Sequence, residues 1–147
     1  MTSETTTASA LSDAQQQRLS AILDTVLPAS EDGTMPSAGE LDFLIYLREQ
    51  AEDFMPTLGR IVDNFDDAFP GQALSSRVAL MKDYATADTK TFADLLFHIY
   101  DCYYQDNRVR TAIGVLPGAI FPQGNVIQAG DLSLLVGVAE RSQGYRR

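Results

Sequence analysis

The chain has few of the residues from which catalytic and metal sites are usually built, because its 147 residues include one cysteine, Cys102, and one histidine, His98. A single cysteine cannot form a disulfide within the chain. One histidine and one cysteine also cannot form a closed zinc site without several carboxylates. Cysteine usage therefore indicates neither a redox compartment nor a structural metal.

Positive charge is also scarce: 11 lysines and arginines stand against 20 acidic residues, which leaves a net charge of −9. Phosphate backbones and anionic membrane surfaces repel such a chain. No apolar run approaches the roughly 20 residues that a membrane span needs. We therefore expect no nucleic-acid binding and no direct membrane span.

Several sequence motifs of catalytic and nucleotide-binding sites are missing, namely the Gly-rich phosphate loop, GxSxG, HExxH, CxxC and GxGxxG. Acidic residues cluster at positions 63, 66 and 67, but the spacing of an EF-hand is absent, so we interpret them as a solvated face. We assign no catalytic, cofactor-binding or metal-binding residue, and we expect no Rossmann site for FAD or NAD in this chain.

The chain contains 45% apolar and 21% charged residues, a composition typical of globular proteins. A chain of this length can bury one full core. We predict an all-α protein, a compact bundle of about five helices with a loop-rich C-terminal arm. A flexible tail is expected at 1–10, the helical domain at 11–110, and the extended arm at 111–147 as part of the same domain.

Helical periodicity places the five helices at about residues 12–27, 37–50, 56–69, 74–84 and 91–105. The first two begin with capping boxes at Ser12 and Ser37, each with Gln or Glu three residues later. Pro56 suits the first turn of the third helix. The many glycines and prolines after Asn107 predict the arm, with a short helix at 131–138 and a possible strand near Val126.

The helix at 91–105 has more apolar surface than one core stripe requires. Its core stripe is expected to contain Phe92, Leu95, Leu96, Ile99 and Tyr103. A second strip, which we call the aromatic strip, consists of Phe97, Tyr100 and Tyr104 on another side of the helix. Exposed aromatics in one patch are typical of interfaces, whereas a covering by the C-terminal arm would make the strip part of the core.

His98 lies opposite the core stripe on the helical wheel, with Asp94 four residues before it and Asp101 three residues after it. We interpret this arrangement as charge pairing on a solvated face, because no third convergent group points to catalysis or metal binding. Cys102 lies at the edge of the core stripe. It is interpreted as a small buried hydrophobe, since no second histidine is present to activate its thiol.

Four segments resemble the gluconate 2-dehydrogenase subunit 3 family. They are ILDTVLP at 22–28 with the acidic Ser/Gly/Pro loop that follows, LDFL at 41–44, YYQDNR at 103–108 and FPQG at 121–124. The segments occur in the order expected for that family and span nearly the whole chain.

The resemblance implies a small, non-catalytic helical subunit of an FAD-dependent sugar or glycoside oxidoreductase of the glucose-methanol-choline type. In that family a large partner subunit carries the FAD and the catalytic base, and a cytochrome c subunit is sometimes present. The small subunit is implied to stabilise, mature or help export the large one. We assign partner contacts to Phe97, Tyr100, Tyr104, Phe121 and Pro122.

One departure from the family concerns export. Family members often begin with a twin-arginine signal, whereas the first arginine here is Arg18, inside the first predicted helix. Residues 1–10 also lack a basic start and an apolar segment. We therefore expect a cytoplasmic protein, with the periplasm as the alternative if a signal was removed or is carried by the partner.

Two other functions stay open. The chain could be a stand-alone helical lyase, hydratase-like enzyme or small-ligand binder that uses His98 with Asp94 or Asp101 as acid–base groups. It could also be a homo-oligomeric scaffold.

Overall fold

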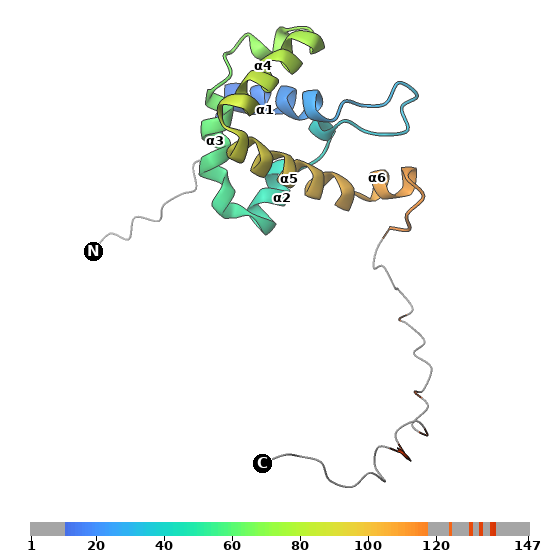
Figure 1. Cartoon of the computed structure of the whole chain (residues 1–147). Helices are drawn as coiled ribbons and strands as arrows, with labels where there is room; N and C mark the ends of the chain where they lie inside the picture. Colours follow the sequence, from blue (N-terminus) through green and yellow to red (C-terminus); the bar gives the residue numbers. More distant parts are fainter. Residues whose placement is uncertain (1–10, 118–123, 125–129, 131–132, 134–135, 138–147) are drawn as a thin grey trace, which may run out of the picture. The chain divides into compact units, whose positions relative to one another are not determined.

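Six α-helices and three short 3-10 turns form the first part of the chain in the computed structural model, which describes residues 11–117, 124, 130, 133, 136 and 137 (Figure 1). The α-helices are α1 (Asp13–Val26), α2 (Phe43–Gln50), α3 (Met55–Asp63), α4 (Leu74–Ala87), α5 (Thr89–Gln105) and α6 (Asn107–Ala112). The turns are η1 (Ala38–Glu40), η2 (Glu52–Phe54) and η3 (Phe69–Gly71). The described residues contain no strand, and the predicted all-α class is confirmed.

The chain divides into two units, residues 1–117 and 118–147. In the second unit Ser133, Val136 and Gly137 are helical, within the segment for which the sequence predicts a short helix. The possible strand near Val126 falls outside the described residues.

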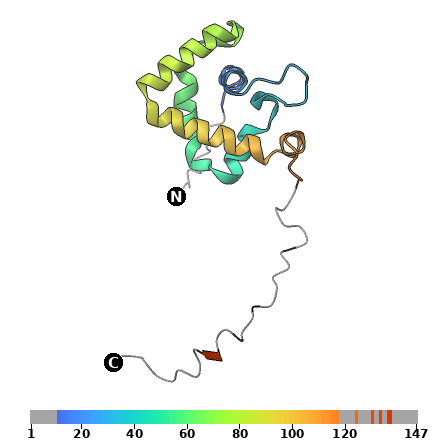
Figure 2. The same cartoon turned by 45° about the vertical axis from the view of Figure 1, so that its right-hand side comes forward.

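The core of the first unit lies between α1, α3 and α5. Helix α2 packs against α5, and α4 packs against both α5 and α1. Figure 2, in which α1 is seen nearly end-on, shows α4 and α5 forming a V around it. The largest fully buried side chains come from α1, α2, α3, α5, α6 and η3: Ile22, Leu47, Leu58, Ile61, Val62, Phe69, Leu95, Ile99 and Val109.

The two predicted capping boxes are both present, but only the first begins an α-helix. At α1 the Ser12 hydroxyl accepts from Gln15 N at 3.2 Å, and the Gln15 side chain accepts from Ser12 N at 2.9 Å. The box at Ser37 holds only the turn η1, and α2 begins at Phe43 rather than near residue 37. The extended backbone at Leu41 interrupts the helix and lets Leu41 and Phe43 both reach the core.

The third predicted helix is shorter than expected, because α3 ends at Asp63 rather than near residue 69. The Asn64 side chain donates to Arg60 O at 2.7 Å, and the Asp66 carboxylate accepts from Ala68 N at 3.1 Å. Asn and Asp side chains compete in this way with the helical backbone. The apolar residues that suggested a longer helix, Phe65 and Phe69, are buried nevertheless.

The short helix α6 was not predicted. Its N-cap is Asp106, whose carboxylate accepts from Arg108 N at 2.8 Å and Val109 N at 3.4 Å. Val109 is fully buried and fixes α6 to the bundle. The signal in the sequence was Asp106 in an N-cap position, ahead of one apolar residue.

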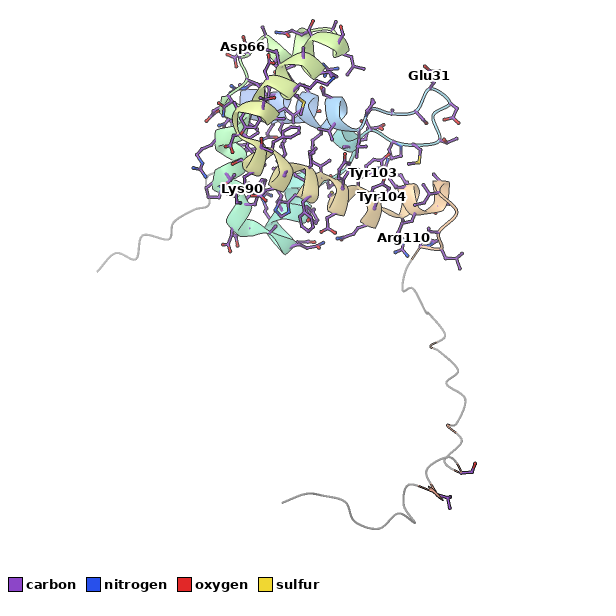
Figure 3. The ribbon with its side chains drawn as sticks, viewed as in Figure 1. Glu31, Asp66, Lys90, Tyr103, Tyr104 and Arg110 are labelled. Carbon is purple, nitrogen blue, oxygen red and sulfur yellow. The ribbon has the colours of Figure 1, made fainter. Side chains whose placement is uncertain are left out.

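A loop between α1 and η1 projects from the bundle, and Figure 3 labels Glu31 near its outer end. The two ends of the loop are tied together, because Ala38 N donates to Leu27 O at 2.9 Å. The Tyr103 hydroxyl of α5 donates to Pro36 O at 2.8 Å, which anchors the end of the loop that leads into η1 to the bundle.

The tip of this loop satisfies its own hydrogen bonds. The Asp32 carboxylate accepts from the Ser30 hydroxyl at 2.6 Å and from Thr34 N at 3.1 Å. These bonds stabilise the ionised carboxylate and lower the pKa of Asp32 to about 2. Gly33 has a φ of 72°, a backbone conformation that favours glycine.

At Gly39 the turn η1 lies directly against the Asp24 side chain of α1. A Cβ atom at Gly39 would overlap the carboxylate of Asp24 on α1. The Oδ1 atom of Asp24 is buried and has no hydrogen-bond partner among the described residues. The close approach therefore depends on the absence of a side chain at position 39.

We expect Gly39→Ala to lower the free energy of unfolding by about 1–3 kcal/mol, because the added methyl group must displace Asp24 or the turn. Urea unfolding followed by circular dichroism would measure this loss. The control is Gly71→Ala, where a Cβ atom meets open space. In a chain that already carries Asp24→Ala, Gly39→Ala should lower the free energy of unfolding by less than it does in the unchanged chain. An equal decrease in both chains would contradict the proposed overlap.

Candidate functional site on helix α5

Helix α5 presents three different sides. It begins at the N-cap Asp88, whose carboxylate accepts from Thr91 N at 3.2 Å. One side is buried in the core and carries Leu95, Ile99 and Tyr103. Because residues on a helix advance by about 100° each, the flanks of this core side are occupied by different residues. The flank of Tyr100 and Tyr104 is aromatic and exposed, and the flank of His98 is polar and covered by α2 and η2. The exposed ring of Phe97 lies 5.4 Å from the ring of His98 and so adjoins the polar flank.

The aromatic strip predicted from the sequence is exposed on α5. The exposed fractions are 65% for Phe97, 42% for Tyr100 and 51% for Tyr104. The rings of Tyr100 and Tyr104 lie 6.5 Å apart. Figure 3 shows Tyr104 near the C-terminal end of α5, next to Tyr103. The two other residues assigned to partner contacts, Phe121 and Pro122, lie outside the described residues.

The aromatic strip continues into an apolar groove at the junction of α1, α4 and α5. We call it the α4–α5 groove; it encloses about 220 Å³. It is lined by Thr25, Val26, Val78, Met81, Lys82, Ala85, Phe92, Leu96 and Tyr100. Tyr100 belongs to both features, so the groove and the strip form one surface. Most of the α4 side of this groove was missed in the sequence, where α4 shows no clear apolar stripe to indicate it.

On the opposite flank of α5, a polar cluster joins α5 to α2 and η2. The Tyr46 hydroxyl of α2 donates to Asp101 Oδ2 at 2.6 Å and lies 3.3 Å from His98 Nδ1. Because the single phenol proton goes to Asp101, the second contact requires His98 Nδ1–H to donate to the phenol oxygen. The ring of Phe54 lies 4.4 Å from the ring of His98.

The prediction that His98 forms charge pairs on a solvated face is wrong. His98 is half-buried beneath η2, and the two acids expected to pair with it have other partners. Asp94 pairs with Lys90 at 2.8 Å, and Asp101 binds Tyr46. A helical wheel of α5 alone could not show that a second helix covers this flank.

Burial of the cluster changes its acid–base properties. Desolvation lowers the pKa of His98, an effect that the charges of Asp101 and Asp94 only partly oppose. Desolvation and the hydrogen bond to Asp101 both raise the pKa of Tyr46. In the cluster the neutral phenol of Tyr46 therefore bridges the neutral imidazole of His98 and the carboxylate of Asp101, an arrangement that joins α2 to α5.

The thiol of Cys102 is half-buried against the core, in keeping with its interpretation as a small hydrophobe. Burial, followed by the nearby charges of Asp106, Asp101 and Asp42, raises the pKa of this thiol to about 11. The thiolate needed for nucleophilic attack is therefore scarce at neutral pH.

Two acidic residues of the predicted solvated face near α3 form ion pairs with an arginine of α1. Arg18 lies 3.7 Å from carboxylate oxygens of both Asp63 and Asp67, and its guanidinium donates to Phe65 O at 2.8 Å. Among residues 11–117 and the few described beyond them, no three histidine, cysteine or acidic side chains gather as a metal site would require. No helix in the same part of the chain is long and apolar enough to cross a membrane.

Comparisons with models of known protein families, with curated protein sequences and with solved structures each return no significant match. Membership of the gluconate 2-dehydrogenase subunit 3 family thus stays a prediction from the four segments that resemble it. The functional argument depends on the surfaces of α5.

We expect Tyr46→Phe to lower the free energy of unfolding by about 1–2 kcal/mol, because it removes the hydrogen bond to the Asp101 carboxylate. Chemical denaturation at pH 7 would measure the change. Tyr100→Phe is the matched control, since no partner of the Tyr100 hydroxyl is found in the described part of the chain. Equal stabilities of the two variants would contradict the role of Tyr46 in holding α2 to α5.

We also expect the free energy of unfolding to fall as the pH is lowered from 7 to 5. The pKa of His98 is lower in the folded chain than its ordinary value of 6.5. The unfolded chain then takes up a proton that the folded chain excludes, so acid favours unfolding, by at most about 1.4 kcal/mol per pH unit for one proton. Denaturation at several pH values would show this slope, and His98→Gln should remove it. A slope that persists in the variant would assign the effect to other groups.

Proposed function

We propose that this chain is a non-catalytic accessory subunit of an FAD-dependent sugar or glycoside oxidoreductase of the glucose-methanol-choline type. It stabilises or matures a large subunit that carries the FAD. A cytochrome c subunit can complete the complex, and assembly takes place in the cytoplasm. The proposal joins the four family-like segments to one structural observation, the exposed aromatic strip of α5.

The aromatic strip supports a partner-binding role because of its size and position. Phe97, Tyr100 and Tyr104 each leave between two fifths and two thirds of their surface exposed. Tyrosine and phenylalanine are enriched at the centres of interfaces, where their burial contributes much of the binding energy. A partner that covers this strip would remove a large apolar surface from water.

The polar cluster supports the absence of catalysis in this chain. Asp101 and Asp94 are engaged by Tyr46 and Lys90, so neither is available to His98 as a free acid–base partner. The Cys102 thiol is protonated at neutral pH. The proposal therefore assigns the redox chemistry to the partner and a binding role to this chain.

Co-expression with the oxidoreductase encoded nearest to this gene tests the proposal. Gel filtration is recorded at the flavin absorbance, with light scattering to give the mass. Co-elution with a yellow large subunit that is insoluble or inactive alone is the expected result. A colourless chain that elutes separately would overturn the accessory role, and a self-associated chain of defined mass would favour the homo-oligomeric scaffold.

We expect Phe97→Ala and Tyr104→Ala each to weaken the complex about tenfold or more, because each removes an aromatic side chain from the interface. Titration of the purified large subunit, followed by calorimetry, would measure the affinities. Ile45→Ala provides the control, since Ile45 is 48% exposed and lies on α2 outside the strip. Affinities equal to that of the unchanged chain would remove the strip from the interface.

A further inference from the structure

The α4–α5 groove has a distribution of charge that indicates what it binds. Its walls are apolar except for two hydroxyl groups and one charged side chain, Lys82 on α4. The Thr25 hydroxyl is already bound to Ala21 O at 2.6 Å. Lys82 is exposed, and its ammonium group has no ion-pair partner among the described residues.

Lys82 carries a positive charge in a chain whose net charge is −9. Lys90 and Arg18 are engaged by Asp94 and Asp63, whereas Lys82, like Arg48, has no ion-pair partner in the part of the chain that the structure describes. The groove thus combines an apolar floor with a free positive charge at its edge. Its complement is an apolar surface that carries a carboxylate.

The shape of the groove and its surroundings favours a helix over a small molecule. The groove is open to solvent and continues through Tyr100 into the aromatic strip, so an occupant can extend beyond the 220 Å³ that it encloses. An amphipathic helix places apolar side chains three and four residues apart into such a groove and keeps its polar side in water. A carboxylate at the border of its apolar side would reach Lys82.

We propose that the α4–α5 groove binds one amphipathic helix of the flavin-bearing subunit, with an aspartate or glutamate of that helix paired to Lys82. This inference depends on the proposed function and adds the element of the partner that is bound. The groove receives the apolar side of the helix, and the aromatic strip covers its flank. Lys82 sets the direction and register of the helix along α4.

A photo-crosslinker at the groove tests this inference in the complex of full-length chains. Para-benzoylphenylalanine replaces Ala85, which lines the groove, and in a second variant it replaces the exposed Lys82 in case the first does not fold. The same group at Glu49, an exposed position on α2, is the control. After irradiation, mass spectrometry locates the attachment point on the partner.

The expected result is attachment within a single helical segment of the flavoprotein that carries an acidic residue, and no such product from position 49. Attachment to an irregular segment or to a second copy of this chain would overturn the inference. Co-elution of the two subunits without attachment from either groove position would overturn it as well, while leaving the accessory role intact. Failure of the unsubstituted chain to co-elute with the flavoprotein would overturn both.

Charge reversal supplies an independent readout. We expect Lys82→Glu to weaken the complex about tenfold at low salt, because like charges then face each other at the groove, and the loss should shrink as salt is added. The control is Arg48→Glu, which reverses an exposed charge on α2 outside the groove. Unchanged affinity for Lys82→Glu, or an equal loss for both variants, would overturn the pairing.

Discussion

The burial of one side of α5 is the constraint on which the rest of the structure depends. Once Leu95, Ile99 and Tyr103 face the core, the direction of every other side chain on this 17-residue helix is determined by the helical repeat. His98 must then face α2 and η2, and Tyr100 must face the junction with α1 and α4. The orientation of α5 about its own axis therefore determines the positions of both the polar cluster and the α4–α5 groove.

The two flanks of α5 differ in whether their side chains find partners within the chain. On the flank of His98, the bundle covers the helix, and the polar groups form hydrogen bonds with one another at 2.6 and 3.3 Å. On the flank of Tyr100, the described residues leave aromatic rings in water and a cation unpaired. A buried polar group without a partner is costly, so the first flank is closed from within the chain. The second flank has surface available for another molecule.

The sequence predicted what depends on local repeats and missed what depends on neighbours. The aromatic strip was predictable, because Phe97, Tyr100 and Tyr104 follow the period of a helix. The surroundings of His98 were not, because the wheel of one helix contains no information about Phe54 and Tyr46, which are distant in the chain. The α4–α5 groove was hidden for the same reason: α1, α4 and α5 each supply only part of its wall. Asp106 was a readable N-cap, but the single buried Val109 behind it gave too short a pattern to predict α6.

The loop between α1 and η1 is anchored to the bundle near Pro36, but its tip is independent of the fold that carries it. Its ends are joined by the bond from Ala38 to Leu27, and its tip around Asp32 satisfies its own hydrogen bonds. Lengthening such a closed loop costs little, about 0.6 kcal/mol for each doubling of its length, because the entropy of closure grows only with the logarithm of length. Residues 31–34 are therefore a natural insertion point, where an epitope or a fluorescent reporter could be added with the bundle and both flanks of α5 unaltered.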